Sequence, residues 1–201
     1  MIKGFLFDYD GVMTNNNDAN IPPSEHLAQI LGKSPEEIND LFMSFWPEYL
    51  RGKITDEQLW SSLEDKTGVK VPVDQRDIWS KWEQLQPLPE MNELISSLQA
   101  DGYPVGVLTN VTPTTEEEVR LGGGYDRFDF HVKSCEVGYA KPELEIYEIA
   151  MKHLKGLKPE EVVFTDDRER FLVPARAMGM QAILATSSHQ VIRDIHRLLT
   201  I

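Results

Sequence analysis

The sequence predicts an α/β protein with a Rossmann-like parallel sheet flanked by helices and an all-α domain inserted after the first strand. Three observations lead to this fold class. Short apolar runs that end in polar residues recur along the chain, and helical patterns separate the last four of them. Residues 15–88 break this alternation and carry only helical patterns. Strands that alternate with helices indicate a parallel sheet with both faces covered.

Five apolar runs have the length and composition of strands. They are rich in Val, Ile, Leu and Phe and are bounded by residues that favour turns. In chain order they read GFLFDYD, PVGVLTN, DFHVKS, EVVFTDD and QAILATS. Ligands of such sheets bind beyond the carboxyl ends of the strands, so the polar residues that follow each run are the candidate site residues.

Helical patterns lie between these runs. One has apolar residues at a spacing of three and four, with Gly102 as its expected C-terminal cap, and these residues are Met91, Leu94, Ile95 and Leu98. A second is expected to begin with Pro142 at its first position and repeats apolar residues at Ile146, Ile149, Ala150 and Leu154.

The segment 15–88 shows no convincing strand and several helix signals. Ser34 with Glu37 and Thr55 with Gln58 have the spacing of capping boxes, and Gly68 is placed to end the second helix. A further helical pattern places Ile78, Trp79, Trp82 and Leu85 on one face. We therefore predict a core domain of residues 1–14 and 89–201 and an inserted helical domain of residues 15–88.

Composition narrows the possible partners and the compartment. A net charge of −13 argues against nucleic acid, because binding there requires basic surface. The chain has no apolar run long enough to span a membrane, and its N-terminal apolar run is too short for a signal peptide. Cys135 is the single cysteine, which excludes an intrachain disulfide and fits a reducing cytosol. We expect a cytoplasmic protein, a monomer or a homodimer, that binds neither nucleic acid nor a membrane.

Paired carboxylates follow two of the expected strands. Asp8 and Asp10 come after the first, and Asp166 and Asp167 end the EVVFTDD run. Four acidic side chains at one edge of a sheet repel one another unless a cation lies between them. Oxygen ligands without histidine or cysteine are typical of Mg²⁺. Taken alone, either pair is also explained as a solvated turn or as a helix-capping pair.

Two further strand ends supply groups that can bind an anion. Thr109 and Asn110 follow the second strand and offer a hydroxyl and an amide, and Lys141 supplies a positive charge. Each has a simpler explanation, since the Thr-Asn pair can be a turn and a lysine before a proline is most often at the surface. The order of these residues on successive strand ends favours a single site.

These residues carry a family resemblance. The segments FDYDGV, VLTN, AKPELEIY and FTDDRERFLVPARAMGM resemble the four-motif signature of the haloacid dehalogenase-like (HAD) hydrolase superfamily. The stretch SCEVGYAKP is similar to the one before the motif lysine in its phosphatase-like subfamilies. The resemblance covers residues 1–14 and 89–201, and the inserted helices stand where those enzymes carry a helical cap.

The resemblance implies a mechanism of phosphoryl transfer. Asp8 would be the nucleophile that forms an aspartyl-phosphate, and Asp10 the general acid and then the general base. Thr109, with the backbone of Asn110, would bind the phosphoryl oxygens, and Lys141 would neutralise charge in the transition state.

A magnesium ion is also implied, together with a substrate class. The ion would be held by Asp8, the backbone carbonyl of Asp10 and Asp167, with Asp166 binding directly or through water. The substrate would be a small phosphorylated metabolite such as a sugar phosphate. Phe171 departs from the pattern, because many relatives have asparagine there, and this leaves the support of Asp167 and Lys141 open. Pro174 is harmless if its helix begins near Phe171.

Asp10 distinguishes activities within the superfamily. The dehalogenases lack a second aspartate two positions after the nucleophile, so Asp10 favours a phosphatase over carbon–halogen cleavage. A sugar phosphomutase using the same aspartyl-phosphate and a binding protein without turnover remain alternatives.

The inserted helices suggest substrate contacts. The segment YLRGKITDEQLW resembles an arginine-glycine stretch in caps of sugar-1-phosphate phosphatases, and Arg51 and Lys53 are its candidate substrate-binding residues. The alternative is a helix connection with two solvated cations around Gly52. The aromatic residues Trp46, Tyr49, Trp60, Trp79 and Trp82 could stack on a ligand but at helical spacing are more often core.

Overall fold

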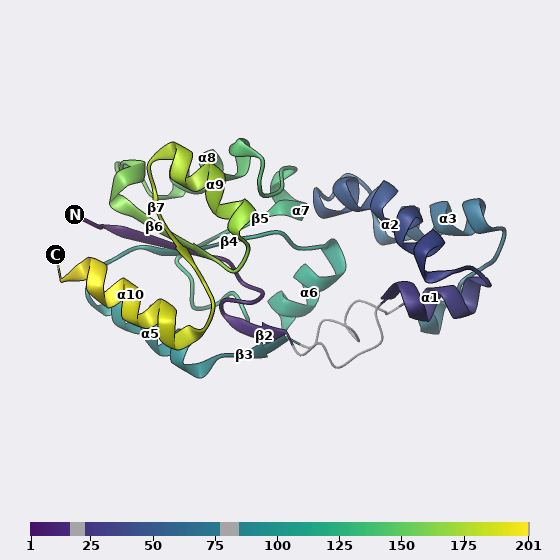
Figure 1. Ribbon diagram of the computed structural model, residues 1–201, viewed down its shortest axis with the longest axis horizontal. Helices are drawn as coiled ribbons and strands as arrows, with labels where there is room; N and C mark the ends of the chain where they lie inside the picture. The colour runs from purple at the N-terminus through teal and green to yellow at the C-terminus, as the bar shows by residue number, and fades with distance from the viewer. Residues whose placement is uncertain (17–22, 77–84, 201) are drawn as a thin grey trace.

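A computed structural model describes residues 1–16, 23–76 and 85–200 of the chain (Figure 1). Its centre is a five-stranded sheet in the order β5-β4-β1-β6-β7, in which every neighbouring pair is parallel. The strands are β1 (Gly4–Phe7), β4 (Val105–Thr109), β5 (Phe130–Lys133), β6 (Val162–Asp166) and β7 (Gln181–Leu184). All five runs predicted as strands are strands, and the predicted parallel α/β fold is confirmed.

The central strands are buried on both faces. Every residue of β1, β4 and β6 is buried, which matches their uninterrupted apolar sequences. Phe7 pairs with Val107 of β4 on one side and with Thr165 of β6 on the other. This register brings the ends of the three strands level, so Asp8, Thr109 and Asp166 emerge at the same edge of the sheet.

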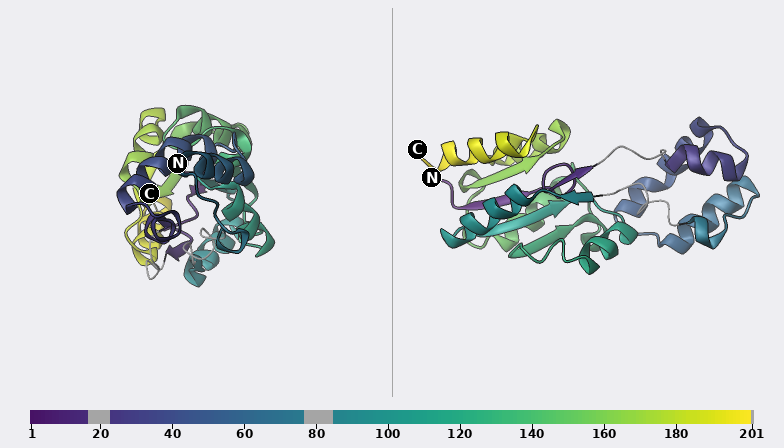
Figure 2. Two further views of the ribbon diagram at one scale, coloured as in Figure 1. Left: turned by 90° about the vertical axis from the view of Figure 1, so that its right-hand side faces the viewer. Right: turned by 90° about the horizontal axis from the view of Figure 1, so that it is seen from below.

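Helices cover both faces of the sheet (Figures 1 and 2). On one face lie α5 (Pro89–Ala100) and α10 (Ser188–Leu199), and on the other lie α8 (Leu144–His153) and α9 (Glu169–Met178). The connections between strands also contain α6 (Pro113–Leu121), α7 (Ser134–Val137) and the short 3₁₀ turn Pro159–Glu161. Each face has its own buried apolar cluster. The predicted apolar residues of α5 are all buried, and they are Met91, Leu94, Ile95 and Leu98.

The end of α5 agrees with the sequence prediction. Gly102 has a left-handed backbone (φ +85°) and donates its N–H to the carbonyl of Gln99. The N–H of Tyr103 bonds to the carbonyl of Leu98. This pair of bonds is the Schellman arrangement that favours glycine after a helix.

Two helix starts differ from prediction. Glu143 is extended (φ −64°, ψ 136°), so α8 begins at Leu144 and Pro142, which follows a cis peptide bond, lies outside it. In the other case α9 begins at Glu169, two residues before Phe171. Pro174 is therefore an interior residue of α9 rather than a first-turn residue, and the helix continues past it to Met178.

The inserted segment forms helices with a buried cluster of their own. They are α1 (Pro23–Leu31), α2 (Pro35–Leu50) and α3 (Asp56–Thr67), followed by the 3₁₀ turn Val73–Gln75. Both predicted capping boxes form, and Gly68 caps α3 with φ +71°. The buried cluster includes Leu27, Ile38, Tyr49, Leu59, Trp60 and Leu63. These helices project beyond the end of the sheet where β1 and β4 finish (Figures 1 and 2).

The prediction of no strand in residues 15–88 is wrong at both ends of the segment. The strand β2 (Thr14–Asn16) pairs antiparallel with β3 (Leu85–Pro87). The two connections to the inserted helices run side by side in opposite directions, and this lets three-residue strands pair without any sequence periodicity. Leu85 therefore belongs to β3 rather than to a helix. Ile78, Trp79 and Trp82 lie outside the described residues, and the domain boundaries stay a prediction.

Candidate active site

Asp8 follows β1 at the centre of the sheet and is almost fully buried, with 6% of its surface exposed. Its backbone N–H donates to the carbonyl of Thr165, 2.9 Å away, which continues the pairing of β1 with β6. Its carboxylate oxygen Oδ1 accepts the N–H of Tyr9 at 2.8 Å and lies 2.9 Å from the Lys141 ammonium. Both contacts fall on Oδ1, so the side chain is oriented while Oδ2 is left without a hydrogen bond among the described residues.

Lys141 bridges two strand ends. Its fully buried ammonium lies 2.9 Å from Asp8 and 2.6 Å from Oδ2 of Asp166. Asn110 holds the backbone of this lysine by two reciprocal bonds, accepting its N–H at 2.7 Å and donating to its carbonyl at 2.8 Å. The amide predicted to bind substrate is thus committed to the loop that presents Lys141. This assigns the Asn110 side chain a positioning contact, which the sequence pattern did not indicate.

Phe171, the residue that departs from the family pattern, places its ring against the Lys141 ammonium. The Lys141 ammonium lies 5.1 Å from the centre of the Phe171 ring and 5.6 Å from that of Phe164. The Tyr147 hydroxyl donates to the Phe171 carbonyl at 2.6 Å and fixes this backbone. Aromatic faces attract cations. The lysine is therefore supported by two carboxylates and two rings.

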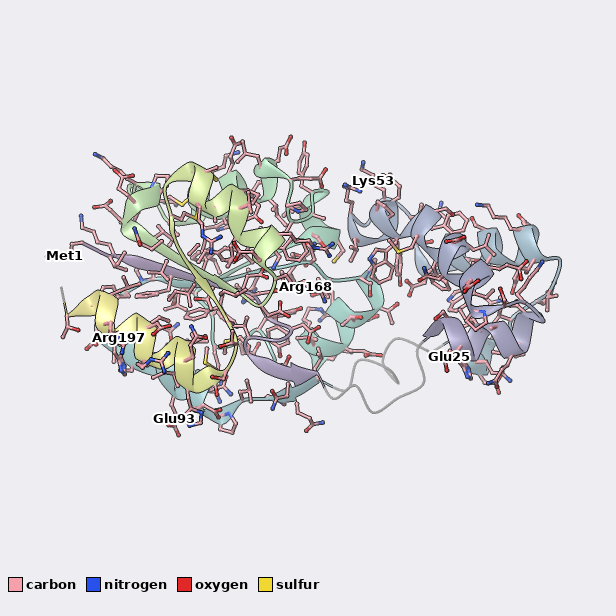
Figure 3. The ribbon with its side chains drawn as sticks, viewed as in Figure 1. Met1, Glu25, Lys53, Glu93, Arg168 and Arg197 are labelled. Carbon is pink, nitrogen blue, oxygen red and sulfur yellow. The ribbon has the colours of Figure 1, made fainter. Side chains whose placement is uncertain are left out.

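Three carboxylates form a group with the spacing of a metal site. One oxygen from each of Asp8, Asp166 and Asp167 lies within 4.8 Å of the others. Asp166 also accepts the backbone N–H of Arg168 at 2.8 Å. Arg168 lies at the end of the sheet that faces the inserted helices (Figure 3).

Gly11 leaves room for the Asp167 carboxylate. It has φ +75°, and a Cβ at this position would come within 2.7 Å of an Asp167 oxygen. A larger residue at Gly11 would displace this carboxylate.

The carboxyl groups at this end of the sheet have raised pKa values, which a bound cation would lower. Burial raises the pKa of Asp8 to about 7, against the opposing effect of the Lys141 ammonium, and the charge of Asp166 adds to the rise. Burial and the charge of Asp167 raise the pKa of Asp10. Burial and the charge of Asp166 raise the pKa of Asp167. A divalent cation bound to these oxygens would favour their ionised forms.

Asp10 and Thr109 line a cavity of about 50 Å³. Thr109 is almost fully buried, whereas Asp10 is half-buried and accepts a long bond of 3.5 Å from the Thr14 hydroxyl. The cavity is lined from the sheet by Tyr9, Asp10, Thr109 and Asn110, from the α6 side by Val111, Thr112, Thr115, Val119 and Tyr125, and by Trp46, Leu50 and Leu85. The sequence pattern had not indicated Tyr9 or Tyr125, since neither belongs to an expected set of charged or hydroxyl groups.

The structure does not bring Arg51 and Lys53 to the carboxylates. The Arg51 guanidinium lies 2.9 Å from Glu143, beside the loop of Lys141, and donates to the Pro47 carbonyl. Lys53 is half-exposed at the end of the inserted helices that is nearest the sheet, 3.5 Å from Glu48 (Figure 3).

Among the aromatic residues of the inserted helices, only Trp46 lines the cavity within the described part of the chain. Trp60 and Tyr49 belong to the buried cluster of the helices. The Tyr49 hydroxyl is within 3.0 Å of that of Thr114 on α6 and bonds to Asp56. These contacts agree with a core role for Trp60 and Tyr49.

Comparison with known proteins identifies the family of this chain. The family model of haloacid dehalogenase-like hydrolases matches residues 2–190. Among curated proteins, bifunctional epoxide hydrolase 2 of Rattus norvegicus is 28% identical over 213 residues, which are 95% of this chain and 38% of the rat protein. The glyceraldehyde 3-phosphate phosphatase of Methanocaldococcus jannaschii is 27% identical over 202 residues, covering 90% of this chain and 83% of that protein. The chain thus spans well under half the length of the rat relative.

Solved structures agree on the fold. A HAD family enzyme from Bacteroides thetaiotaomicron, solved in complex with magnesium and inorganic phosphate, superposes with a TM-score of 0.77 at 23% identity. The match covers 94% of this chain and 99% of that enzyme. Because the family model covers nearly the whole chain, this protein belongs to the haloacid dehalogenase-like hydrolases.

Proposed function

We propose that this hydrolase is a Mg²⁺-dependent phosphatase that cleaves a small phosphomonoester through an aspartyl-phosphate on Asp8. The observation that carries the proposal is the buried Lys141 ammonium, which lies between Asp8 and Asp166 in a group of three carboxylates. Such a group places positive charge beside a nucleophilic carboxylate, as phosphoryl transfer requires. The matches to curated phosphatases support the same reaction class.

The residues present fit a magnesium ion. The clustered donors are all oxygens, and Mg²⁺ prefers one or two carboxylates together with water and substrate phosphate. Asp8, Asp167 and the backbone carbonyl of Asp10 would hold the ion. Asp166 already accepts bonds from Lys141 and Arg168, which favours its contribution through water. The bound ion would supply positive charge to the phosphoryl oxygens.

The first step is an in-line attack by an Asp8 carboxylate oxygen on phosphorus. The bond between phosphorus and the ester oxygen breaks, and the leaving oxygen takes a proton from Asp10. The raised pKa of Asp10 suits it to carry that proton. Lys141 and the Thr109 hydroxyl stabilise the charge on the transferring phosphoryl group.

The second step releases phosphate. Asp10, now ionised, takes a proton from a water molecule whose oxygen attacks the phosphorus of the aspartyl-phosphate. The acyl–phosphate bond between phosphorus and the Asp8 oxygen breaks, which gives inorganic phosphate and restores both carboxyl groups to their starting states. The same two residues therefore serve both halves of the reaction.

The inserted helices complete the proposal as a cap. Trp46 and Leu50 of α2 line the cavity beside Asp10, so this segment covers the site at the end of the sheet. Closure of such a segment excludes water from the reaction. Arg51 and Lys53 remain proposed substrate-binding residues only if the cap moves, because both now pair with glutamates.

A phosphate-release assay tests the function. Wild-type protein with Mg²⁺ is compared with Asp8→Asn over a panel of small phosphomonoesters. We expect release from several of them, removed by chelation of Mg²⁺ and reduced at least about a thousandfold in Asp8→Asn. Isomerised sugar phosphate without inorganic phosphate would indicate a mutase, and chloride release from a haloacid a dehalogenase. Binding of phosphomonoesters without turnover would overturn the enzyme proposal.

A further inference from the structure

The inserted helices and the core have separate apolar clusters. In the described part of the chain, the buried cluster of the inserted helices shares no residue with the two clusters of the core. α6 and α7 lie at the end of the sheet next to the inserted helices (Figure 1). Two units joined in this way can move against each other unless specific bonds hold them. The polar bonds between them therefore decide how firmly the site is covered.

Asp56, the first residue of α3, accepts hydrogen bonds from both units. Its Oδ1 accepts the hydroxyl of Tyr49, from the last turn of α2. Its Oδ2 accepts the hydroxyl of Thr114, from the first turn of α6 in the core, at 2.5 Å. The two hydroxyl oxygens lie 3.0 Å apart, so the three side chains form a closed group. We call Tyr49, Asp56 and Thr114 the Asp56 cluster.

The Asp56 carboxylate is free for these two bonds. Thr55 and Gln58 form the capping box of α3, so the start of this helix does not need Asp56. Burial and the bond to Asp56 raise the pKa of Tyr49 above its usual range, so its hydroxyl stays protonated and donates. Hydrogen bonds to an ionised carboxylate are roughly twice as strong as bonds between neutral groups. The Asp56 cluster can therefore hold the two units together, and water can replace its bonds when they part.

The Asp56 cluster lies between two walls of the cavity that contains Asp10. Thr112 and Thr115, on either side of Thr114 in the sequence, line the cavity from the core. Trp46 lines it from the inserted helices, and the centre of its ring lies 6.1 Å from that of Tyr49. The cluster therefore bonds the helix that carries one wall to the helix that carries the other.

The core side of this contact is fixed independently of the inserted helices. Thr112, three residues after Thr109, is the N-cap of α6, and its hydroxyl accepts the Thr115 N–H at 3.2 Å. The Ser134 hydroxyl of α7 accepts the Val111 N–H at 3.0 Å. Loss of the Asp56 cluster should therefore move the inserted helices and leave the loop of Thr109 in place.

We infer that Asp56 is a positioning residue, which keeps the cavity closed over the aspartyl-phosphate by bonding Tyr49 and Thr114. This inference rests on the proposed phosphatase function and names a control on the same site. A closed cavity restricts attack on the aspartyl-phosphate to the water inside it. When the cavity opens, an alcohol from the solvent can replace this water. The alcohol oxygen then attacks phosphorus, the bond from phosphorus to Asp8 breaks, and the alcohol proton passes to Asp10.

Thr114→Val tests the inference from the core side, because it removes one hydroxyl and keeps the shape of the side chain. Cleavage of p-nitrophenyl phosphate is followed in the presence of glycerol, and p-nitrophenol and inorganic phosphate are both measured. An excess of p-nitrophenol over phosphate reports transfer to glycerol. We expect the ratio of transfer to hydrolysis to rise about tenfold in Thr114→Val, as for the loss of one hydrogen bond to a charged group. Thr114→Ser keeps the hydroxyl and should keep the wild-type ratio.

Thr67→Val is the matched control. The Thr67 hydroxyl donates to the Leu63 carbonyl at 2.8 Å within α3, so this variant loses a bond of the inserted helices that does not reach α6. It should keep the wild-type ratio. Asp56→Ala should raise the ratio at least as much as Thr114→Val. The double variant should equal Asp56→Ala, because both changes break the same bond.

The position of the inserted helices is measured independently of activity. Nitroxide labels are attached at Glu57→Cys on α3 and Glu117→Cys on α6, both at exposed positions, in a Cys135→Ser background. Pulsed electron spin resonance then gives the distribution of distances between the labels. We expect longer distances when Thr114→Val is added and an unchanged distribution when Thr67→Val is added.

The ratio and the distance together separate this inference from the proposed function. If p-nitrophenol is released and Thr114→Val changes neither quantity, the role of Asp56 is overturned and the phosphatase stands. Longer distances with an unchanged ratio also overturn the positioning role, because the bonds then hold the helices without controlling access to Asp8. If wild type releases no p-nitrophenol, the proposed function fails and the role of Asp56 in the reaction fails with it.

Discussion

Arg51 and Glu143 form an ion pair that joins the inserted helices to the loop of Lys141. The Arg51 Nε lies 2.9 Å from Oε2 of Glu143, and the same oxygen accepts the backbone N–H of Ala140 at 2.7 Å. Ala140 directly precedes Lys141. The end of α2 is therefore linked through one carboxylate to the loop that presents the lysine to Asp8.

Disrupting this pair should reduce activity through Lys141. We expect Arg51→Ala and Glu143→Ala each to lower kcat/KM about tenfold, because a charge-assisted bond to a half-buried carboxylate is lost. If Arg51 acts through Glu143, the double variant should be no worse than either single one. Fully additive losses would mean that Arg51 contacts the substrate instead. Arg197→Ala, which removes an exposed ion pair on α10, is the control.

Gly52 should tolerate no side chain, because the inserted helices contact the core there. A Cβ on Gly52 would lie 2.0 Å from the Cys135 carbonyl oxygen. Gly32 has nearly the same left-handed backbone (φ +63° against +64°) but open space around it. Gly32→Ala should lower the unfolding free energy by about 1–2 kcal/mol, from backbone strain alone. Gly52→Ala should lower the unfolding free energy by more than this, or should reduce kcat/KM because α2 is displaced. Equal stability and equal activity of the two variants would show that the contact does not form.

Gly11→Ala should weaken Mg²⁺ binding. The added Cβ would approach the Asp167 oxygen to 2.7 Å and displace a proposed metal ligand. We expect the dissociation constant of Mg²⁺, measured by calorimetry without substrate, to rise about tenfold or more. Gly32→Ala is again the control for the strain of alanine in a left-handed backbone. An unchanged Mg²⁺ affinity would place the ion away from Asp167.

Phe171 should support Lys141 through its ring face. Phe171→Leu removes the aromatic ring 5.1 Å from the ammonium, and we expect kcat to fall about three- to tenfold, as for the loss of one buried cation–π contact. Phe171→Tyr keeps the ring face and should keep kcat. If leucine and tyrosine have the same effect, the ring contributes only packing.

The sequence predicted which strand-end residues lie together, but not the contacts that hold them in place. Uninterrupted apolar strands fix the edge of the sheet at which Asp8, Thr109 and Asp166 meet, so their convergence follows from the strand pairing. Lys141 reaches this edge from the loop after α7, whose course no local pattern indicates. The partner of Arg51 does not follow, since Glu143 is 92 positions away and many glutamates are available. The commitment of Asn110 to the backbone of Lys141 is likewise a tertiary contact without a local signal.

The sequence did not indicate the strands β2 and β3 or the start of α8, because the local patterns there are short. The strands β2 and β3 have three residues each, too few to show an alternating pattern. The start of α8 depends on the extended backbone of Glu143, whose carboxylate bonds to both Arg51 and Ala140. Proline at the first position of a helix is a statistical preference, and this network of contacts overrides it.

The central claim is that Asp8 carries the phosphoryl group during turnover. Acid quenching of wild-type protein during hydrolysis of a phosphomonoester with Mg²⁺, followed by mass spectrometry of the peptide that contains Asp8, tests it directly. We predict that this peptide gains the mass of one HPO₃ group on Asp8 in wild type and none in Asp8→Asn. With p-nitrophenyl phosphate, whose leaving group needs no proton from Asp10, Asp10→Asn should gain more of this mass than wild type, because only dephosphorylation is slowed. Rapid phosphate release by wild-type protein, with no phosphorylated Asp8 in either wild type or Asp10→Asn, would contradict the account.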